Sequence, residues 1–210
     1  AIEYIPRFGE RLADAVREWG SWVKDRALVR LDGCFPRDQG GATPIAYIWA
    51  RQIQCEGPGC GVRVPMLRTL WLARKGSRRI GMKLLAATGA AIDVKIVHGD
   101  ATRDCDTGTV RRGAVVCPCC GFTTPVERVR EQLKSRRGGT RDARLMCVAT
   151  LRAGTQGRFY RLATEADLAA LRLAEAMLPA LSGALGLSAV PDEPISQNEL
   201  RRISVPLYGM

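Results

Sequence analysis

The spacing of apolar residues predicts a long helix near the N-terminus. Between Phe8 and Leu31 they recur at helical intervals, and most charged residues fall between them. The members of this apolar stripe are Leu12, Val16, Trp19, Val23, Ala27 and Leu31. Gly20 weakens the helix by up to about 1 kcal/mol without breaking the pattern. Trp19 and Trp22 lie on or beside the stripe, so we interpret them as core anchors rather than as platforms for stacked bases.

Segments rich in β-branched and aromatic residues follow, bounded by glycines and polar turns, and they predict strands. These segments cover residues 44–55, 62–72, 80–87, 91–98 and 109–116. A basic turn at 74–79 joins two of them. The simplest arrangement is an antiparallel sheet.

The C-terminal part combines helical patterns with a hairpin. Residues 126–137 predict a helix, with Pro125 suited to its first turn. Residues 144–152 and 158–162 predict a β-hairpin. After the hairpin, the stretch 164–167 resembles a capping box that begins an amphipathic helix, and we expect Pro179 to end that helix.

These elements predict an α+β fold: a zinc-ribbon-like antiparallel sheet flanked by an N-terminal helix and by a C-terminal helix and hairpin region. We divide the chain into an N-terminal helical segment, a β domain, a basic helix–hairpin–helix region and a tail that leads to a downstream part. Their bounds are 1–43, 44–125, 126–186 and 187–210. The first residue is Ala rather than Met, which is typical of an excised segment of a longer protein.

Two cysteine clusters carry the strongest chemical signal. The first reads Cys55-Glu-Gly-Pro-Gly-Cys60-Gly61, and the second reads Cys117-Pro-Cys119-Cys120-Gly121. Each cluster places two thiols in a tight turn followed by glycine, which readily adopts the positive φ needed to leave the turn. Two such turns supply the four thiolates of a tetrahedral structural Zn²⁺ site.

The four expected zinc ligands are Cys55, Cys60, Cys117 and Cys120. Cys119 competes with Cys120, but Cys-Pro-x-Cys-Gly fits the turn and would direct Cys119 away from the metal. Buried or disulfide-bonded cysteines are the alternative interpretation, which the paired spacing disfavours. The single histidine, His98, is interpreted as a surface residue because four thiols already complete a zinc shell.

The charge of the chain favours a polyanionic partner. Its 210 residues include 32 Lys and Arg against 21 Asp and Glu, a formal net charge of +11. Arginine pairs bidentately with phosphate, and phosphate contacts provide most non-specific affinity for nucleic acids. The alternative is an arginine-rich surface that serves only solubility.

The basic residues concentrate in a few stretches, which we predict to face phosphates. Residues 126–161 contain ten Lys and Arg but only three acidic residues, and the turns at 74–79 and 111–112 add more. The expected DNA-contacting residues are Arg74, Lys75, Arg78, Arg79, Arg111, Arg112, Arg128, Arg130, Lys134, Arg136 and Arg137.

No catalytic or cofactor-binding constellation is visible. The chain lacks a glycine-rich loop after a strand, and any Ser/His/Asp set would have to use His98. A closed four-thiolate zinc site leaves no position for a reactive water. No apolar run is long enough to span a membrane, and eight cysteines without a signal peptide predict a cytoplasmic protein with reduced thiols.

Several motifs, in order along nearly the whole chain, resemble a bacterial and archaeal family of adenine-specific DNA methylases that contain a zinc ribbon. They are Glu18-Trp19-Gly20-x-Trp22-Val23, Pro44-Ile-Ala-Tyr-Ile-Trp-Ala-Arg51, the Cys55–Gly61 turn, Pro65-x-x-Arg68-x-x-Trp71-Leu72, Gly108-Thr109-Val110-x-Arg112-Gly113, Cys117-Pro-x-Cys120-Gly121 and Tyr208-Gly-Met210. The family's cofactor loop and its catalytic Asp/Asn-Pro-Pro-Tyr motif do not occur in this chain. The resemblance therefore carries over the four zinc cysteines and no catalytic residue.

The resemblance implies a zinc-ribbon insert of a methyltransferase that uses S-adenosylmethionine in its full-length form. We expect this insert to bind DNA or to help recognise the target, with DNA and the flanking methyltransferase halves as partners. The alternative is a structural or protein-interaction scaffold, without DNA affinity, that docks other subunits of a DNA-modification or defence complex.

Overall fold

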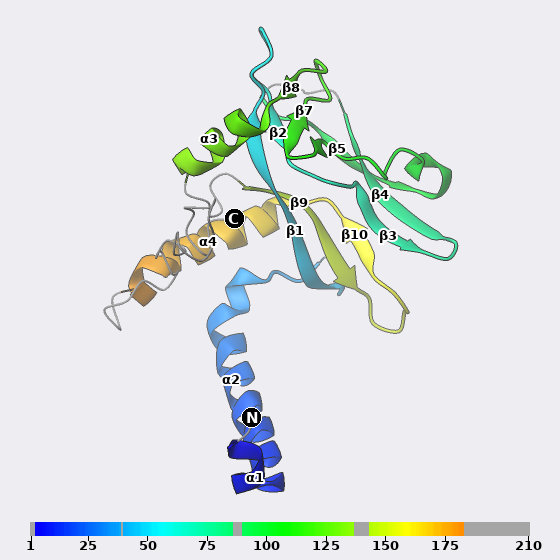
Figure 1. Ribbon diagram of the computed structural model, residues 1–210. Helices are drawn as coiled ribbons and strands as arrows, with labels where there is room; N and C mark the ends of the chain where they lie inside the picture. The colour runs from blue at the N-terminus through cyan, green and yellow to red at the C-terminus, as the bar shows by residue number, and fades with distance from the viewer. Residues whose placement is uncertain (1–2, 39, 86–89, 137–142, 183–210) are drawn as a thin grey trace.

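A computed structural model describes residues 3–38, 40–85, 90–136 and 143–182, and it has an α+β architecture (Figure 1). A long N-terminal helix projects from a body of antiparallel sheets, and a second long helix follows the sheets at the C-terminal end. The fold class predicted from the sequence is confirmed. The tail at 187–210 and Arg137 lie outside the described residues.

The N-terminal helical region is interrupted once, and most of its side chains are exposed. α2 (Glu10–Leu31) matches the helix predicted from Phe8 to Leu31, and a short helix that was not predicted, α1 (Tyr4–Phe8), precedes it. Gly9, with a φ of 53°, separates the two helices, and a short 3₁₀ turn, η1 (Asp32–Cys34), follows α2. Neither helix contains a buried residue. Trp19 and Trp22 are 62% and 51% exposed, so their interpretation as core anchors is wrong for this part of the chain. The apolar stripe is present, but the described body does not cover it.

A four-stranded antiparallel sheet in the order β10-β9-β1-β2 forms the centre of the body. Its long strand β1 (Thr43–Gln54) pairs with β9 (Ala143–Leu151) over most of its length and then with the short β2 (Arg63–Pro65). β10 (Phe159–Arg161) completes the predicted hairpin with β9. Segments about 100 positions apart in the sequence are thus joined along β1.

Two smaller antiparallel sheets complete the β structure. One contains β3 (Trp71–Lys75), β4 (Arg78–Leu84) and β5 (Val94–His98), which is followed by the 3₁₀ turn η2 (Gly99–Thr102). The other contains β6 (Val110–Arg111), β7 (Ala114–Val116) and β8 (Thr123–Thr124). The single expected sheet is therefore divided into three.

The described chain buries two apolar clusters. The first surrounds the cysteine turns and consists of Ile53, Cys55, Val62, Val64, Ile92, Val115, Cys117 and Val129. The second lies between the central sheet and the β3-β4-β5 sheet and consists of Ala50, Leu70, Met82, Val97, Cys105, Met146 and Cys147. Both clusters include a residue from the second half of β1, with Ile53 in the first and Ala50 in the second.

A close contact connects the segment from Pro65 to Leu67, at the end of β2, with Gly108 and Thr109, which precede β6. The Thr109 hydroxyl donates to the Pro65 carbonyl at 2.5 Å and accepts from the Leu67 amide at 3.0 Å. A Cβ atom on Gly108 would lie 2.1 Å from the Leu67 carbonyl oxygen, so the approach of these segments requires glycine. Two of the motifs that carry the family resemblance therefore contact one another.

Two further helices flank the sheets (Figure 1). α3 (Val126–Arg136) agrees with the predicted basic helix, and α4 (Glu165–Ser182) begins at the predicted capping box. The Thr164 amide donates to the Asp167 carboxylate at 2.8 Å, and the Asp167 amide donates back to the Thr164 hydroxyl at 3.5 Å. The prediction that Pro179 ends α4 is wrong, because the helix continues for its last turn beyond it, where a proline removes only one backbone hydrogen bond.

A partly buried arginine at the end of β10 links α4 to the loop that precedes β1. The Arg161 guanidinium pairs with the Asp38 and Asp167 carboxylates, and the Asp167 side chain is completely buried. None of the described helices is both long and apolar enough to cross a membrane.

Candidate metal centre

The two cysteine turns are the loops of two β-hairpins. Cys55 directly follows β1 and Cys60 precedes β2, so the first pair lies in the β1–β2 connection of the central sheet. Cys117 directly follows β7 and Cys120 precedes β8, so the second pair lies in the β7–β8 connection. The four thiols therefore bridge two sheets that share no strand.

The geometry of the four sulfur atoms matches a tetrahedral metal site. All four lie within 4.8 Å of one another; the Sγ atoms of Cys55 and Cys120 are 3.6 Å apart, and those of Cys60 and Cys117 are 3.9 Å apart. Four ligands about 2.3 Å from a tetrahedral centre lie about 3.8 Å from one another. A disulfide would require about 2.05 Å, so these cysteines are not bonded in pairs. The cluster is consistent with a structural Zn²⁺ site.

The two turns have matching backbones, which explains why both sulfur pairs face the same point. The Cys55 amide donates to the Val62 carbonyl and the Cys117 amide donates to the Phe122 carbonyl, each at 2.9 Å. The glycine after each second cysteine has a positive φ, 60° at Gly61 and 75° at Gly121. This conformation is the one that the Cys-Gly pattern in the sequence predicted.

The turns also approach one another too closely for a side chain at Gly57. A Cβ atom there would lie 2.8 Å from the Cβ atom of Phe122 and 3.0 Å from the Cys120 sulfur. The Gly57 amide points at the Cys55 sulfur, 3.4 Å away. Such an N–H contact favours a thiolate over a thiol, because it places a partial positive charge beside the anion.

Burial differs among the four thiols. Cys55 and Cys117 are 3% and 2% exposed, whereas Cys120 is exposed to solvent. Burial raises the pKa of Cys55 to about 12, and the Phe122 backbone N–H lowers the pKa of Cys120 to about 7. A bound metal would replace the proton on the buried thiol and compensate the charge of its thiolate. The arrangement is thus a closed site set partly in the protein core.

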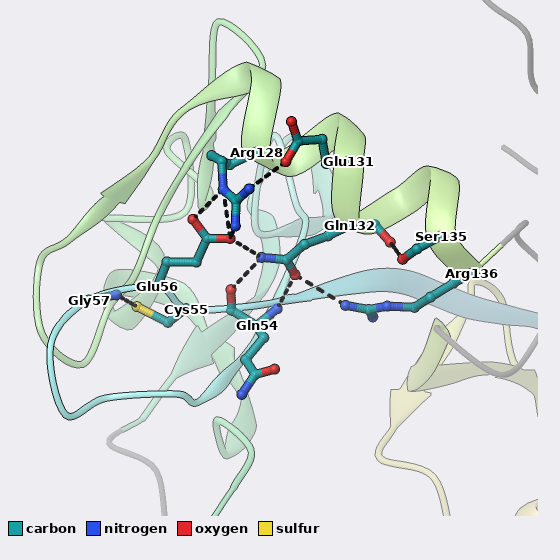
Figure 2. A network of polar contacts seen from close by, with 9 residues as sticks. All are labelled: Gln54, Cys55, Glu56, Gly57, Arg128, Glu131, Gln132, Ser135 and Arg136. Atoms are coloured by element: carbon teal, nitrogen blue, oxygen red, sulfur yellow. Dashed lines mark hydrogen bonds and ion pairs between the residues drawn. The ribbon is translucent and has the colours of Figure 1, made fainter.

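Helix α3 is attached to the first cysteine turn by the polar network in Figure 2. The Arg128 guanidinium pairs with the carboxylate of Glu56, which immediately follows Cys55, and also with Glu131. The Gln132 side chain donates to the Gln54 carbonyl at 2.9 Å and accepts from the Gln54 amide at 2.8 Å. The hydrogen bond from Arg128 lowers the pKa of Glu56. The network fixes α3 beside the cluster and includes two of the predicted DNA-contacting arginines, Arg128 and Arg136.

The remaining cysteines and the histidine lie outside the thiol cluster. Cys119 is exposed and is not among the four clustered sulfurs, whereas Cys105 and Cys147 are buried in the second apolar cluster. His98 is exposed at the end of β5, as predicted. Within the described residues, the four cysteines are the only group of three or more potential metal ligands.

The structure does not gather all of the predicted DNA-contacting residues. The basic residues of α3 lie on the opposite side of the molecule from the β3–β4 turn in Figure 1. Arg136 donates to the Gln52 carbonyl and to Gln132, and Arg74 pairs with Asp106, so both have intramolecular roles. Side chains that are exposed and without an ion pair in the described part of the chain are Lys75, Arg79, Arg111, Arg112, Arg130 and Lys134.

Two hairpins that are distant in the sequence do meet. The tips of β3–β4 and β9–β10 extend in the same direction (Figure 1). The Arg78 and Arg152 guanidinium groups lie 5.6 and 4.5 Å from the centre of the Phe159 ring, and Arg78 donates to the Arg158 carbonyl. We call this the hairpin surface and define it as Lys75, Arg78, Arg79, Arg152, Arg158 and Phe159. The expected DNA-contacting residues included Lys75, Arg78 and Arg79, whereas Arg152 and Arg158 were counted only within the basic stretch 126–161. Phe159, the contact that joins the two tips, was missed.

Comparisons with known proteins give no relative: no family model, no curated protein and no solved structure matches the chain. The four-thiol cluster is therefore the feature that characterises the protein chemically.

Proposed function

We propose that this chain is the zinc-ribbon module of an adenine-specific DNA methyltransferase and that it binds duplex DNA through the hairpin surface. The observation that carries the proposal is that two basic hairpin tips meet at one aromatic ring, with the Arg78 and Arg152 guanidinium groups over Phe159 and Arg78 bonded to the Arg158 carbonyl. The motif resemblance supports the methyltransferase context, in which S-adenosylmethionine and the catalytic residues belong to the flanking halves.

The electrostatics of the hairpin surface fit a polyanion. Lys75, Arg79, Arg152 and Arg158 are exposed, and none of them has an ion pair within the described residues. Exposed arginines that are not neutralised by neighbouring carboxylates are available for phosphate oxygens. The zinc cluster would serve this role indirectly, since it fixes the end of β1, whose other part aligns the β9–β10 hairpin.

The test is fluorescence anisotropy of zinc-loaded protein with labelled duplex DNA at a series of salt concentrations. The variant Arg79→Gln/Arg152→Gln/Arg158→Gln should weaken binding, and the slope of log K against log salt should fall by about 0.9 for each phosphate contact that is lost. The matched control, Arg11→Gln/Arg17→Gln/Arg30→Gln on α2, changes the net charge equally. Equal weakening by both variants, or no binding at low salt, would overturn the proposal.

Protein docking is a second candidate function, and the exposure of α1 and α2 favours it. Trp19, Trp22 and Val23 on α2 are each more than half exposed, and the two indoles contact each other edge to face at 5.7 Å. Large apolar surfaces on soluble proteins mark interaction sites. The partner we propose is the flanking methyltransferase part that the resemblance implies.

The docking function is tested by titrating the chain with the flanking part of its parent protein, supplied as a separate polypeptide. Burial of the two indoles should shift tryptophan emission to shorter wavelength, and Trp19→Ser/Trp22→Ser should abolish the complex. The control Leu28→Ser alters an exposed residue on the opposite face of α2. A complex that tolerates the double tryptophan variant would exclude this surface.

A further inference from the structure

A cavity separate from both the thiol cluster and the hairpin surface lies where the central sheet meets α4 and the start of β5. Its volume is about 600 Å³, within the range typical of small-molecule sites. Trp49 and Gln52 of β1, Arg144 of β9 and Leu168 of α4 contribute to its wall, and Arg63 lies at its rim. Residues from Trp49 to Leu171, on the central sheet, β5 and α4, therefore line it.

The polar side chains that line the cavity are hydrogen-bond donors or amides, and none is acidic. Arg63 is exposed and its guanidinium has no hydrogen bond or ion pair within the described residues. Arg144 donates from one guanidinium nitrogen to the Ile92 carbonyl, which holds the side chain in place and leaves its other N–H groups for a ligand. Two guanidinium groups at one cavity favour an anion with several acceptor oxygens.

Gln52 provides an independent indication of a ligand. It is 7% exposed, it lines the cavity, and its Nε2 group has no hydrogen-bond partner among the described residues. Buried side-chain amides are nearly always hydrogen-bonded, so an unpartnered one in a cavity wall calls for an acceptor. Glutamine amides pair with the ring nitrogen and amino group of nucleobases.

The rest of the wall is apolar and includes one large aromatic ring. Trp49 is half-buried, and Val94, Leu168 and Leu171 supply aliphatic surface. A flat heteroaromatic ring fits such a wall, because it can stack on an indole while its edge accepts hydrogen bonds. An aliphatic carboxylate would satisfy the arginines but would leave the Gln52 amide without an acceptor.

We infer that this cavity binds a nucleotide, with the phosphate at Arg63 and Arg144 and the base between Trp49 and Gln52. The ligand is either a free nucleoside monophosphate or the 5′-phosphorylated end of a nucleic-acid strand, which share this chemistry. The inference does not depend on the proposed duplex binding, because the hairpin surface contributes no residue to the cavity.

The experiment is isothermal titration of the zinc-loaded chain with AMP, with adenosine and inorganic phosphate as partial ligands. We expect saturable binding of AMP, with adenosine and phosphate each at least tenfold weaker. Arg63→Gln should weaken AMP binding at least tenfold but should leave adenosine binding nearly unchanged. Gln52→Leu should weaken both AMP and adenosine, and thermal unfolding of this variant checks that it is folded. The control Arg79→Gln, on the hairpin surface, should bind AMP like the unaltered chain.

Competition distinguishes the two sources of the nucleotide. A 5′-phosphorylated trinucleotide that displaces AMP identifies strand ends as the ligand, whereas displacement only by mononucleotides identifies a free nucleotide; either result supports the inference. Absence of AMP binding, or binding that Arg63→Gln and Gln52→Leu leave unchanged, overturns it. Duplex affinity is measured on the same variants, because a variant that loses AMP binding but keeps its duplex affinity tests the cavity separately from the hairpin surface.

Discussion

Replacing single cysteines tests the four-thiol cluster most directly, because the chain contains its own control. Cys119 lies between two proposed ligands in the sequence but is outside the cluster, whereas Cys117 is 2% exposed within it. We expect Cys119→Ser to retain one zinc ion per chain, and Cys117→Ser and Cys120→Ser to lose it.

The expected loss of stability is large compared with the total stability of a domain. Zinc stabilises the folded chain by RT ln(1 + [Zn]/Kd), which is about 4 kcal/mol when free zinc exceeds Kd a thousandfold. Domains of this size have about 5–15 kcal/mol in total, and 1 kcal/mol shifts Tm by roughly 2–4 °C. Because the buried thiols Cys55 and Cys117 belong to the first apolar cluster, removal of the metal also leaves polar groups inside a core.

The assay combines metal analysis after gel filtration with thermal unfolding followed by circular dichroism. Chelation should lower Tm by about 8–16 °C for the unaltered chain and for Cys119→Ser, as 4 kcal/mol corresponds to that range. Chelation should have no further effect on Cys117→Ser. The assignment would be refuted if Cys119→Ser lost zinc or if Cys120→Ser kept its full zinc content. It would also be refuted if chelation left the Tm of the unaltered chain unchanged.

Three further predictions concern the fold. Arg161→Met leaves the buried Asp167 carboxylate without its ion pair and should reduce the free energy of unfolding by about 3–5 kcal/mol in chemical denaturation. The control Arg172→Met breaks an exposed ion pair on α4 and should change the free energy of unfolding by less than about 1 kcal/mol. Burial acts to raise the pKa of Asp167, but the hydrogen bonds from Arg161 and Thr164 outweigh it and lower the pKa. Ionised Asp167 therefore stabilises the folded chain at pH values above the pKa of an unfolded aspartate, about 3.9. The free energy of unfolding should fall as the pH is lowered below that value. Gly108→Ala places a Cβ against the Leu67 carbonyl and should lower stability by about 1–3 kcal/mol, while Gly20→Ala, in open space on α2, should raise it by up to about 1 kcal/mol.

Local patterns in the sequence were sufficient for the features that depend on neighbouring residues. The Cys-Gly turns at 60–61 and 120–121 determine their own backbone, because a positive φ favours glycine and directs both sulfurs of a turn to one side. The capping box at Thr164 and Asp167 is equally local. These local features were sufficient to predict the four-thiol cluster and the start of α4.

Features that depend on distant partners were not predictable in this way. An amphipathic stripe shows that α2 has an apolar face, but it does not show what covers that face, and Trp19 is exposed in the described chain. Arg161 and Arg128 were included, from the sequence, among the cations of a phosphate-facing surface. In the structure, however, Arg161 pairs with Asp38 and Arg128 pairs with Glu56, both distant in the sequence. Charge pairing of this kind depends on tertiary contacts, to which composition is insensitive.

The division into two apolar clusters determines how far the loss of zinc should spread. The metal ligands belong to the first cluster, whereas the β3–β4 hairpin rests on the second, through Met82 and Cys105. Strand β1 contributes to both clusters and pairs with β9, so it links the thiol site to the β9–β10 half of the hairpin surface. Chelation should therefore loosen Arg152 and Arg158 but leave Arg79 in place. Duplex binding should weaken without zinc while part of its salt dependence remains, and a complete loss of that dependence would show that the two clusters unfold as one unit.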